Sequence, residues 1–424
     1  MPTLLRLATA GSVDDGKSTL VGRLLHDSKS VLADQLDAVE RVSRARGLEG
    51  ADLALLTDGL RAEREQGITI DVAYRYFATA KRSFVLADCP GHVQYTRNTV
   101  TGSSTADALV LLVDARKGVL EQTRRHLAVA GLMRVPHVVI AVNKIDLVEH
   151  SEEVFATVAA DVRRIATALG IPDAHAVPVS ALHGDNVVER SASTPWYDGP
   201  SLLELLETLE PAADPAAEHF RLPVQAVIRP QGAARSAEHV EYRGYAGPVA
   251  SGAVRVGDEV VVQPAGTRTR VVGIDLGERS LEVAVAPQSV TLRLADDVDV
   301  SRGDVVVAAD AVPLLTQDVE ALVCWLADTP LHPGARLLVK HGARTVLAVV
   351  RSVDGRLDLD ALELSAADSL SLNDIGRVTV RLASALPVEE YARSRSGGSF
   401  LLVDPDDGRT LAAAMADAPA PVPT

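Results

Sequence analysis

The first half of the chain alternates between short apolar runs and amphipathic stretches with helical periodicity. Each apolar run ends at a charged, small or turn residue, which is typical of buried strands. Ser151 before two glutamates marks a helix start, and Gly170 before Pro172 marks its end. The expected strands are residues 1–10, 83–87, 109–113, 137–142 and 174–179, and the expected helices are residues 18–25, 151–169 and 201–209. This alternation predicts an α/β domain with a mostly parallel sheet.

The pattern changes after residue 210. Residues 211–215 are rich in proline, alanine and aspartate, which is typical of a linker. Short β-rich runs punctuated by glycine and proline follow in two groups. The expected strands are residues 224–228, 254–256, 259–262, 270–274 and 289–294 in the first group, and 321–326, 336–339, 345–350, 376–382 and 399–403 in the second. Each group predicts a small antiparallel β-barrel.

These patterns predict three domains and a tail. The α/β domain is expected to span residues 1–213, the first barrel 214–312 and the second barrel 313–412. Residues 413–424 are dominated by alanine, proline and aspartate, so we expect a flexible tail there.

Composition limits the cellular compartment and the kinds of partner that we expect for the protein. With 424 residues, 47% of them hydrophobic, the chain can bury several cores, yet its apolar runs are too short for a membrane span. We therefore expect no membrane association. Two cysteines, Cys89 and Cys324, cannot form a disulfide framework, so we expect a cytoplasmic protein. A net charge of -15 disfavours non-specific nucleic-acid binding, and no nucleic-acid partner is expected.

A phosphate-binding motif follows the first expected strand. Residues 11–18, Gly-Ser-Val-Asp-Asp-Gly-Lys-Ser, match G-x-x-x-x-G-K-[ST] and precede an expected helix. The glycines allow backbone N–H groups to face phosphate oxygens, and Lys17 can reach the β- and γ-phosphates. The Ser18 hydroxyl can ligate Mg²⁺. An ordinary glycine-rich turn is the alternative, which the motifs downstream disfavour.

Two further motifs have the spacing of nucleotide-dependent switches. Thr69, within Gly-Ile-Thr-Ile, could close over the γ-phosphate and the metal. Asp88 ends the expected strand at 83–87 and could serve the magnesium shell, and the Gly91 N–H could sense the γ-phosphate. His92 follows Gly91 directly, so we expect it to orient the attacking water, the alternative being a surface histidine.

The last two motifs predict a guanine pocket. Residues 143–146, Asn-Lys-Ile-Asp, follow the strand at 137–142, and the Asp146 carboxylate can accept from guanine N1 and N2. Adenine lacks that donor pair, so the expected nucleotide is GTP. Ser180, Ala181 and Leu182, after the strand at 174–179, would complete the pocket from the other side.

These motifs give the expected site and its cofactors, GTP and Mg²⁺. The expected catalytic residues are His92, Lys17 and Thr69, and the expected metal ligands are Ser18, Thr69 and Asp88. The residues expected to bind the nucleotide are Gly11, Ser12, Val13, Asp14, Asp15, Gly16, Lys17, Ser18, Thr19, Asp88, Cys89, Pro90, Gly91, His92, Asn143, Lys144, Asp146, Ser180, Ala181 and Leu182.

Together the motifs resemble the translational GTPase superfamily, which joins a GTPase domain to two β-barrels. The predicted fold class is accordingly an α/β P-loop GTPase domain followed by two small antiparallel β-barrel domains. Within this superfamily the chain resembles the large, GTP-binding subunits of bacterial heterodimeric sulfate adenylyltransferases. Asp15 distinguishes it from elongation factors, which have histidine there. The other matching segments are residues 56–76, 101–107, 122–126, 196–203 and 372–377.

Two positions depart from this resemblance. Val93 stands where the family usually has an acidic residue, and Pro248 follows Gly247 in a turn that usually contains Gly-Thr. The first departure weakens any inference about contacts between the second switch and a partner. Neither removes an expected nucleotide-binding residue.

The resemblance implies a GTPase subunit of sulfate adenylyltransferase. Such a subunit couples GTP hydrolysis to formation of adenosine 5′-phosphosulfate and pyrophosphate from ATP and sulfate, while a separate small catalytic subunit carries out adenylyl transfer. The alternatives are an elongation factor that delivers aminoacyl-tRNA and a scaffold that binds GTP without hydrolysing it. Residues 396–399, Ser-Gly-Gly-Ser, could be mistaken for a second phosphate loop, but they precede an expected strand, so we expect a turn.

Overall fold

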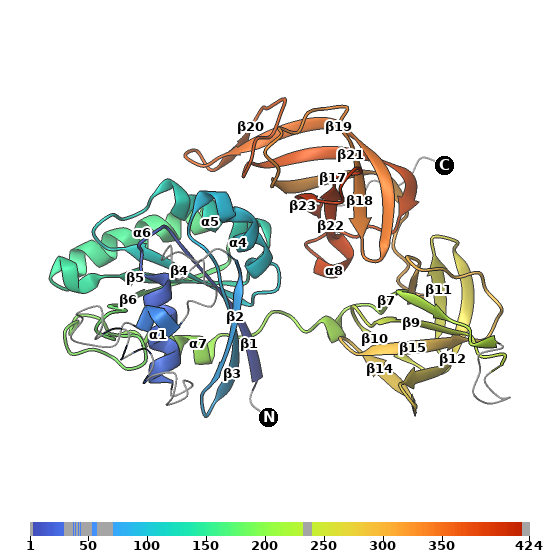
Figure 1. The fold of residues 1–424 in the computed structure, drawn as a ribbon, viewed down its shortest axis with the longest axis horizontal. Helices are drawn as coiled ribbons and strands as arrows, with labels where there is room; N and C mark the ends of the chain where they lie inside the picture. The colour runs from blue at the N-terminus through green and yellow to red at the C-terminus, as the bar shows by residue number, and fades with distance from the viewer. Residues whose placement is uncertain are drawn as a thin grey trace. The chain divides into compact units, whose positions relative to one another are not determined.

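The computed structural model describes residues 3–28, 37, 39, 41, 43, 53–56, 71–231 and 240–417. Thr69 and the Gly-Ile-Thr-Ile motif lie outside the described residues. The chain divides into two compact units, one built on residues 1–212 and the other on residues 213–357 and 364–424 (Figure 1). Among the described helices, none is long and apolar enough to cross a membrane.

The described part of the first unit contains a six-stranded sheet in the order β2-β3-β1-β4-β5-β6. β1 runs parallel to β3 and β4, and the parallel pairing continues through β5 to β6. Only the edge strand β2 is antiparallel, so the prediction of a mostly parallel sheet is confirmed. The strands are β1 (Thr3–Gly11), β2 (Ala73–Ala78), β3 (Arg82–Asp88), β4 (Ala108–Asp114), β5 (His137–Asn143) and β6 (Asp173–Pro178).

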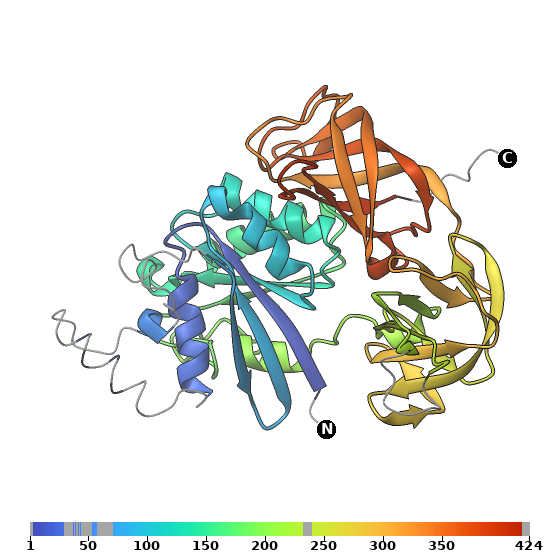
Figure 2. The same cartoon turned by 45° about the vertical axis from the view of Figure 1, so that its right-hand side comes forward.

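Helices cover both faces of this sheet (Figures 1 and 2). Leu5, Leu7 and Phe84 face one core, which α1 and α7 complete. Ala8 and Ala87 point to the opposite face, where their small side chains let α4 approach closely at Gly102. The helices are α1 (Lys17–Asp27), α4 (Thr96–Ser103), α5 (Glu121–Leu132), α6 (Glu152–Ala168) and α7 (Leu202–Thr208), with short 3₁₀ turns at η1 (Leu53–Leu56), η2 (Val93–Tyr95) and η3 (Ile145–Val148).

The helix boundaries follow local side-chain chemistry. Ser151 caps α6 by accepting a hydrogen bond from the Val154 N–H, as the sequence predicts. α7 begins with a capping box, in which Ser201 accepts from the Glu204 N–H and the Glu204 carboxylate accepts from the Ser201 N–H. These caps determine where α6 and α7 begin.

The second unit begins with a curved antiparallel sheet. Its described strands follow the order β7-β16-β11-β12-β15-β9-β8, with β13 paired to β12, and a separate β10–β14 ribbon packs against the same core. The elements are η4 (Pro215–Ala217), β7 (Arg221–Pro223), β8 (Ala226–Ile228), β9 (Gly244–Pro248), β10 (Ala253–Arg255), β11 (Glu259–Gln263), β12 (Thr267–Leu276), β13 (Arg279–Leu281), β14 (Val283–Val285), β15 (Ser289–Leu294) and β16 (Val305–Ala308).

The remaining strands form a closed antiparallel barrel. The order β18-β22-β23-β17-β21-β19 closes because β18 also pairs with β19, and β20 extends the sheet beyond β19. Side chains along β19 alternate between buried and exposed, as a barrel wall requires. The elements are β17 (Thr316–Trp325), β18 (Arg336–His341), β19 (Arg344–Asp358), β20 (Glu363–Ser365), β21 (Ile375–Leu386), α8 (Arg395–Gly398), β22 (Ser399–Val403) and β23 (Thr410–Ala416).

The structure corrects two boundaries in this unit. In place of one strand at 224–228, the structure has β7, which ends at Pro223, and β8, which begins at Ala226. Between them the Val224 N–H donates to the Asp304 carbonyl and the Gln225 N–H donates to the Ala246 carbonyl. The predicted start of the tail at residue 413 is too early, because β23 continues to Ala416 and pairs with both β17 and β22. Alanine-rich β23 is stabilised by pairing on both sides rather than by its intrinsic β-propensity.

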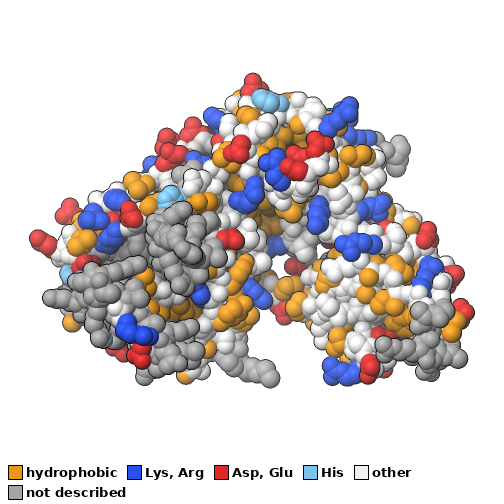
Figure 3. Space-filling model, in the orientation of Figure 1, with side chains coloured by type: hydrophobic (Ala, Val, Ile, Leu, Met, Phe, Trp, Pro, Cys, Tyr) orange, Lys and Arg blue, Asp and Glu red, His pale blue; other side chains and the backbone are white. Residues whose placement is uncertain are grey.

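Ion pairs connect the two β-rich parts of this unit. The buried Arg221 on β7 binds the Glu389 carboxylate with two nitrogens, at 3.0 and 2.9 Å. Arg344 on β19 donates to Asp304 at 3.0 Å. Elsewhere on the face drawn in Figure 3, acidic and basic side chains are interspersed over the described surface.

We predict that truncation distinguishes β23 from the segment beyond it. Ending the chain after Ala412 removes the buried Ala414, Met415 and Ala416 and opens the ladder to β17 and β22. This truncation should lower the melting temperature by more than about 5 °C. Ending the chain after Asp417 keeps every described strand and should leave the melting curve unchanged. Equal melting curves for both truncations would contradict the role assigned to β23.

Candidate nucleotide site

The first expected motif forms a loop between β1, which ends at Gly11, and α1, which begins at Lys17. Gly16 has φ of 94° and Asp14 has φ of 65°, both in the left-handed region. A Cβ at Gly16 would overlap the Asn143 amide nitrogen. Both the backbone conformation and this close contact therefore require glycine at position 16. Within the loop the Ser12 N–H donates to Asp15 Oδ2 at 2.7 Å, which holds the loop closed.

Lys17 is folded back onto this loop. Its Nζ donates to the Gly11 and Ser12 carbonyl oxygens, both at 2.8 Å, and its side chain is buried. Burial lowers the pKa of Lys17, and the nearby carboxylates of Asp15 and Asp88 only partly offset this effect. The ammonium group is thus held in a desolvated position at the carboxyl end of β1.

Asp15 is a buried residue of the same loop. Burial raises the pKa of Asp15, against the opposing effects of the Ser12 N–H and the Lys17 charge. Its Oδ1 and the Ser12 hydroxyl have no hydrogen-bond partner among the described residues. Two buried oxygen atoms of the loop are therefore still able to form hydrogen bonds.

The segment after β3 packs directly on the phosphate loop. Thr9 donates from its hydroxyl to Asp88 Oδ1 at 2.9 Å and accepts from the Cys89 N–H at 3.2 Å, so β1 fixes the end of β3. A Cβ at Gly91 would overlap Lys17 Nζ and the Gly11 carbonyl oxygen. Gly91 is therefore the point where this segment touches the loop. Burial raises the pKa of the Cys89 thiol, which keeps it neutral.

Asn143, at the end of β5, joins two of the loops. Its Nδ2 donates to the Asp15 carbonyl at 2.7 Å, and its Oδ1 accepts from the Ala181 N–H at 2.9 Å. One buried side chain thereby connects the phosphate loop to the loop after β6. Asn143 thus holds the two loops together, and its place in a base pocket stays a prediction.

Lys144 and Asp146 follow Asn143 in a tight turn. Lys144 has φ of 61° and its Nζ binds the Asp14 carbonyl and, at 3.0 Å, Asp114 Oδ2. Hydrogen bonds from Arg116 and Lys144 outweigh the effect of burial and lower the pKa of Asp114. The Asp146 carboxylate lies 3.8 Å from His183 Nε2, and the Asp146 side chain is largely buried in the turn.

The loop after β6 supplies the opposite wall. The Ser180 hydroxyl accepts from the His183 N–H at 3.3 Å, and Arg23 Nε on α1 donates to the Ala181 carbonyl at 3.2 Å. Leu182 is 65% exposed, which suits a side chain that packs against a bound base. Four loops from the carboxyl ends of β1, β3, β5 and β6 therefore meet at one edge of the sheet.

The remaining expected residues occupy this edge as well. Val13 is exposed, Thr19 lies half-buried on α1 and Pro90 is buried beside Gly91. His92 is half-buried and makes an edge contact with the Tyr95 ring, with centroids 6.1 Å apart. Its imidazole is thus held next to Gly91.

Comparison with known proteins gives the family. Residues 3–213 match the elongation factor Tu GTP binding domain, and residues 318–417 match the GTP-eEF1A C-terminal domain-like family. The chain is 54% identical over 417 residues to a bifunctional enzyme CysN/CysC of Mycobacterium tuberculosis, covering 98% of this chain and 67% of that protein. It is 47% identical to sulfate adenylyltransferase subunit 1 of Alteromonas mediterranea and 48% identical to that of Bacteroides fragilis, covering 97% of this chain and 86% and 85% of theirs. The chain belongs to the sulfate adenylyltransferase subunit 1 family.

Sequence reasoning missed two groups at this family's site. Asp114 ends β4 and anchors Lys144, and its position at the carboxyl end of a parallel strand was a usable signal. His126 is buried on α5 beside the phosphate loop, but helical periodicity alone does not show which neighbour a buried histidine contacts.

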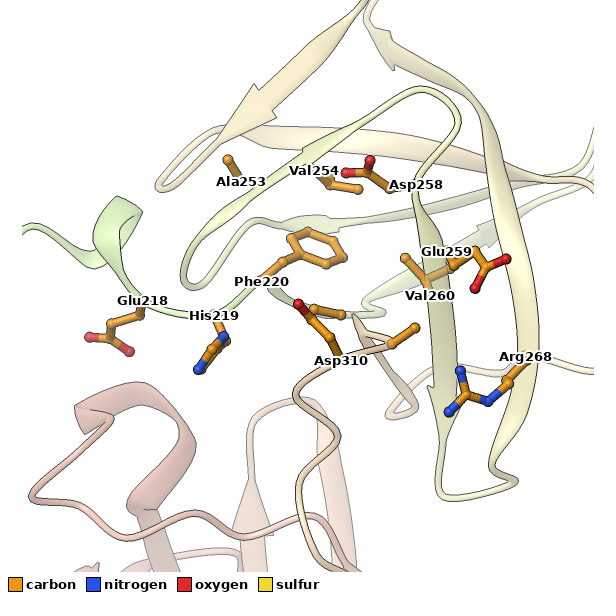
Figure 4. A pocket seen from close by; sticks show the side chains of 12 residues that line it. Glu218, His219, Phe220, Ala253, Val254, Asp258, Glu259, Val260, Arg268 and Asp310 are labelled. Atoms are coloured by element: carbon orange, nitrogen blue, oxygen red, sulfur yellow. The ribbon is translucent and has the colours of Figure 1, made fainter.

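A cavity of about 550 Å³ lies in the second unit (Figure 4). Phe220 and Val260 line it together with Asp258, Glu259 and Arg268. The Ser-Gly-Gly-Ser segment is not a second phosphate site, because α8 is a single helical turn whose Gly397 and Gly398 pack against Glu389 and Tyr391. The sequence predicts a turn there, and the structure has the short helix α8 instead.

We predict that Asn143→Ala uncouples the two loops. Losing both buried hydrogen bonds should destabilise the protein by about 1–3 kcal/mol and weaken GTP binding, because Asp15 and Ala181 are no longer held. Thermal melting and equilibrium titration with GTP measure the two effects. Asn186→Ala is the matched control, since Asn186 is an equally buried amide that bonds to Pro178 and Thr194. If both variants bind GTP like the unmutated protein, the linking role of Asn143 is wrong.

Proposed function

We propose that this chain couples GTP hydrolysis to the formation of adenosine 5′-phosphosulfate and pyrophosphate from ATP and sulfate. Adenylyl transfer is assigned to a separate small catalytic subunit, with which this chain forms a heterodimer in the cytoplasm. The observation that carries the proposal is the meeting of four nucleotide-binding loops at one sheet edge in a member of the sulfate adenylyltransferase subunit 1 family.

The phosphate end of GTP is assigned to residues 11–19. In this assignment Lys17 turns from the Gly11 and Ser12 carbonyl oxygens toward the β- and γ-phosphates. A desolvated ammonium group regains electrostatic stabilisation from a bound anion, so the buried position of Lys17 supports the proposal. The Gly91 N–H, next to Lys17, is suited to sense the γ-phosphate.

The donors near this position fit Mg²⁺. The Ser18 hydroxyl and the buried Asp88 carboxylate are hard oxygen ligands, and Thr9 orients the Asp88 carboxylate. Thr69 is assigned as a further ligand and belongs to the expected first switch. When bound, Mg²⁺ would neutralise the charge that develops on the phosphate oxygens.

The base end of GTP is assigned to the turns after β5 and β6. Asp146 accepts from guanine N1 and N2, and Lys144 and Leu182 flank the ring. The support is geometric, because Asn143 and Arg23 fix the loop after β6, and the Asp146 carboxylate lies in the turn after β5, 3.8 Å from His183 Nε2. Unlike the other side chains of the pocket, the Asp146 carboxylate distinguishes guanine from adenine.

His92 is assigned to orient the attacking water. It follows the glycine that contacts Lys17, and its ring is steadied by Tyr95 rather than buried. This is a positioning role, which requires a hydrogen-bonding side chain at a defined place and no strong base.

Energy coupling explains why a GTPase would serve this reaction. The sulfate-phosphate anhydride in adenosine 5′-phosphosulfate is a high-energy bond, so adenylation of sulfate by ATP is strongly uphill. GTP hydrolysis shifts the adenylation of sulfate toward its products only if the two reactions are coupled in the same complex. Hydrolysis by this chain alone should therefore be slow.

We predict that Asp146→Asn changes base preference. An amide in place of the carboxylate removes the acceptor for guanine N1 and N2 and matches the altered donor pattern of xanthine. The variant should bind GTP at least about tenfold more weakly and xanthosine triphosphate more tightly than the unmutated protein. Competitive titrations with GTP, xanthosine triphosphate and ATP provide the measurement. Equal affinity of the unmutated protein for GTP and ATP would sink the base assignment.

We predict that His92→Ala lowers GTP hydrolysis and GTP-driven synthesis together. The loss should be about 10²-fold, because the water is no longer oriented, while GTP affinity stays nearly unchanged. The assay follows labelled sulfate and released phosphate in one tube with the small subunit, ATP and sulfate present. His175→Ala is the control, since His175 pairs with Asp173 at the opposite end of the sheet.

The same assay tests the alternatives to sulfate activation. If the small subunit and sulfate leave the hydrolysis rate unchanged and no adenosine 5′-phosphosulfate forms, the coupling proposal is wrong. Stimulation by ribosomes instead would favour the elongation-factor alternative.

A further inference from the structure

The buried His126 and the half-buried Gln122 form a polar pair beside the phosphate loop. Both lie on α5, one helical turn apart, in the Gln-Thr-Arg-Arg-His segment that the nucleotide site does not otherwise use. The His126 side chain is 1% exposed, and its ring lies beside the Gly11 backbone and close to the Lys17 charge. Yet its Nδ1 completes no hydrogen bond of normal geometry with a described residue.

The orientation of the Gln122 amide decides which nitrogen of His126 carries the proton. Gln122 Nε2 lies 3.3 Å from His126 Nε2, and in this orientation of the amide Gln122 donates and His126 Nε2 accepts. A neutral ring then carries its proton on Nδ1. Burial lowers the pKa of His126 to about 3, with the Lys17 charge acting in the same direction and the Gly11 backbone only partly opposing it. The ring is therefore neutral and presents an unused N–H donor.

The phosphate loop has a complementary need. In this structure Lys17 Nζ donates to the carbonyl oxygens of Gly11 and Ser12. When Lys17 turns toward a triphosphate, these buried carbonyls lose their donor, and an unpaired buried carbonyl opposes the movement. A second donor beside Gly11 would remove that penalty.

We propose that His126 Nδ1–H takes over the Gly11 carbonyl oxygen when Lys17 turns to the phosphates. His126 is then a positioning residue for triphosphate binding, because it acts on the nucleotide through the loop and through Lys17. Gln122 keeps the ring in the required tautomer. This inference rests on the proposed assignment of Lys17 to the phosphates of GTP.

The test compares three variants with different donors at this position. His126→Asn places an amide nitrogen near the former Nδ1, His126→Gln places one near the former Nε2, and His126→Leu provides no donor. Affinities for GTP and for guanosine are measured on the full chain by calorimetry and ligand-observed NMR, with a thermal melt of each variant. Guanosine has no phosphates, so binding it leaves Lys17 on the loop.

His126→Leu and His126→Gln should weaken GTP binding by about 5- to 150-fold, the loss expected for an unpaired buried carbonyl, and leave guanosine affinity unchanged. His126→Asn should keep GTP affinity within about threefold of the unmutated protein. A merely structural role would instead lower GTP and guanosine affinity by the same factor. The Asn and Gln variants keep the comparison decisive even if the Leu variant does not fold.

Three results would overturn the inference. They are unchanged GTP affinity in His126→Leu, parallel loss of GTP and guanosine affinity, and rescue by Gln in place of Asn. In each of these cases the unmutated protein still binds GTP, so the proposed function stands. Failure of the unmutated protein to bind GTP would overturn both.

Discussion

The buried amide of Asn143 is the interaction on which the geometry of the site depends. It donates to the Asp15 carbonyl and accepts from the Ala181 N–H, so the loops after β1 and β6 are held by the residue that ends β5. The link satisfies polar backbone groups in both loops, and the contacts of Lys144 with the Asp14 carbonyl and of Arg23 with the Ala181 carbonyl reinforce it. Gly16 has to be glycine, since a Cβ there would displace the amide.

A second constraint is the electrostatic state of the loop without nucleotide. Lys17, Asp15 and Asp88 are all buried. Burial lowers the pKa of Lys17 and raises the pKa of Asp15, which favours the neutral form of each side chain. Such an arrangement is costly unless a ligand supplies charge, and a triphosphate with its cation does so. In the proposed function the loop would exchange internal hydrogen bonds for phosphate contacts, and the proposed role of a neutral His126 belongs to that exchange.

The second unit combines two kinds of β-sheet closure. β18 pairs with both β22 and β19, so the ring of strands beginning with β17 has no open edge. In the sheet that runs from β7 to β8, an isolated bridge between Arg221 and Ser251 joins β7 to the segment after β9. A closed ring removes unpaired backbone groups and makes each strand dependent on two neighbours. Even the alanine-rich β23 is therefore ordered.

Much of the α/β unit was predictable because its signals are local. Each motif follows an apolar run, and the carboxyl ends of parallel strands necessarily meet at one edge, so Asp88, Asn143 and Ser180 could be assigned to one site from sequence. Helix caps at Ser151 and Ser201 are equally local. Proximity across the sheet was not predictable in this way: that Asn143 bonds to Asp15, that Gly91 touches Lys17, and that His126 lies beside Gly11 are contacts between distant residues. The sequence by itself determined the motifs, the resemblance to the family and many of the strands and helices, because these depend on periodicity and on neighbouring residues. Only the tertiary structure decided that β23 is a strand and that His126 adjoins the phosphate loop, because strand pairing and burial are set by partners far away along the chain.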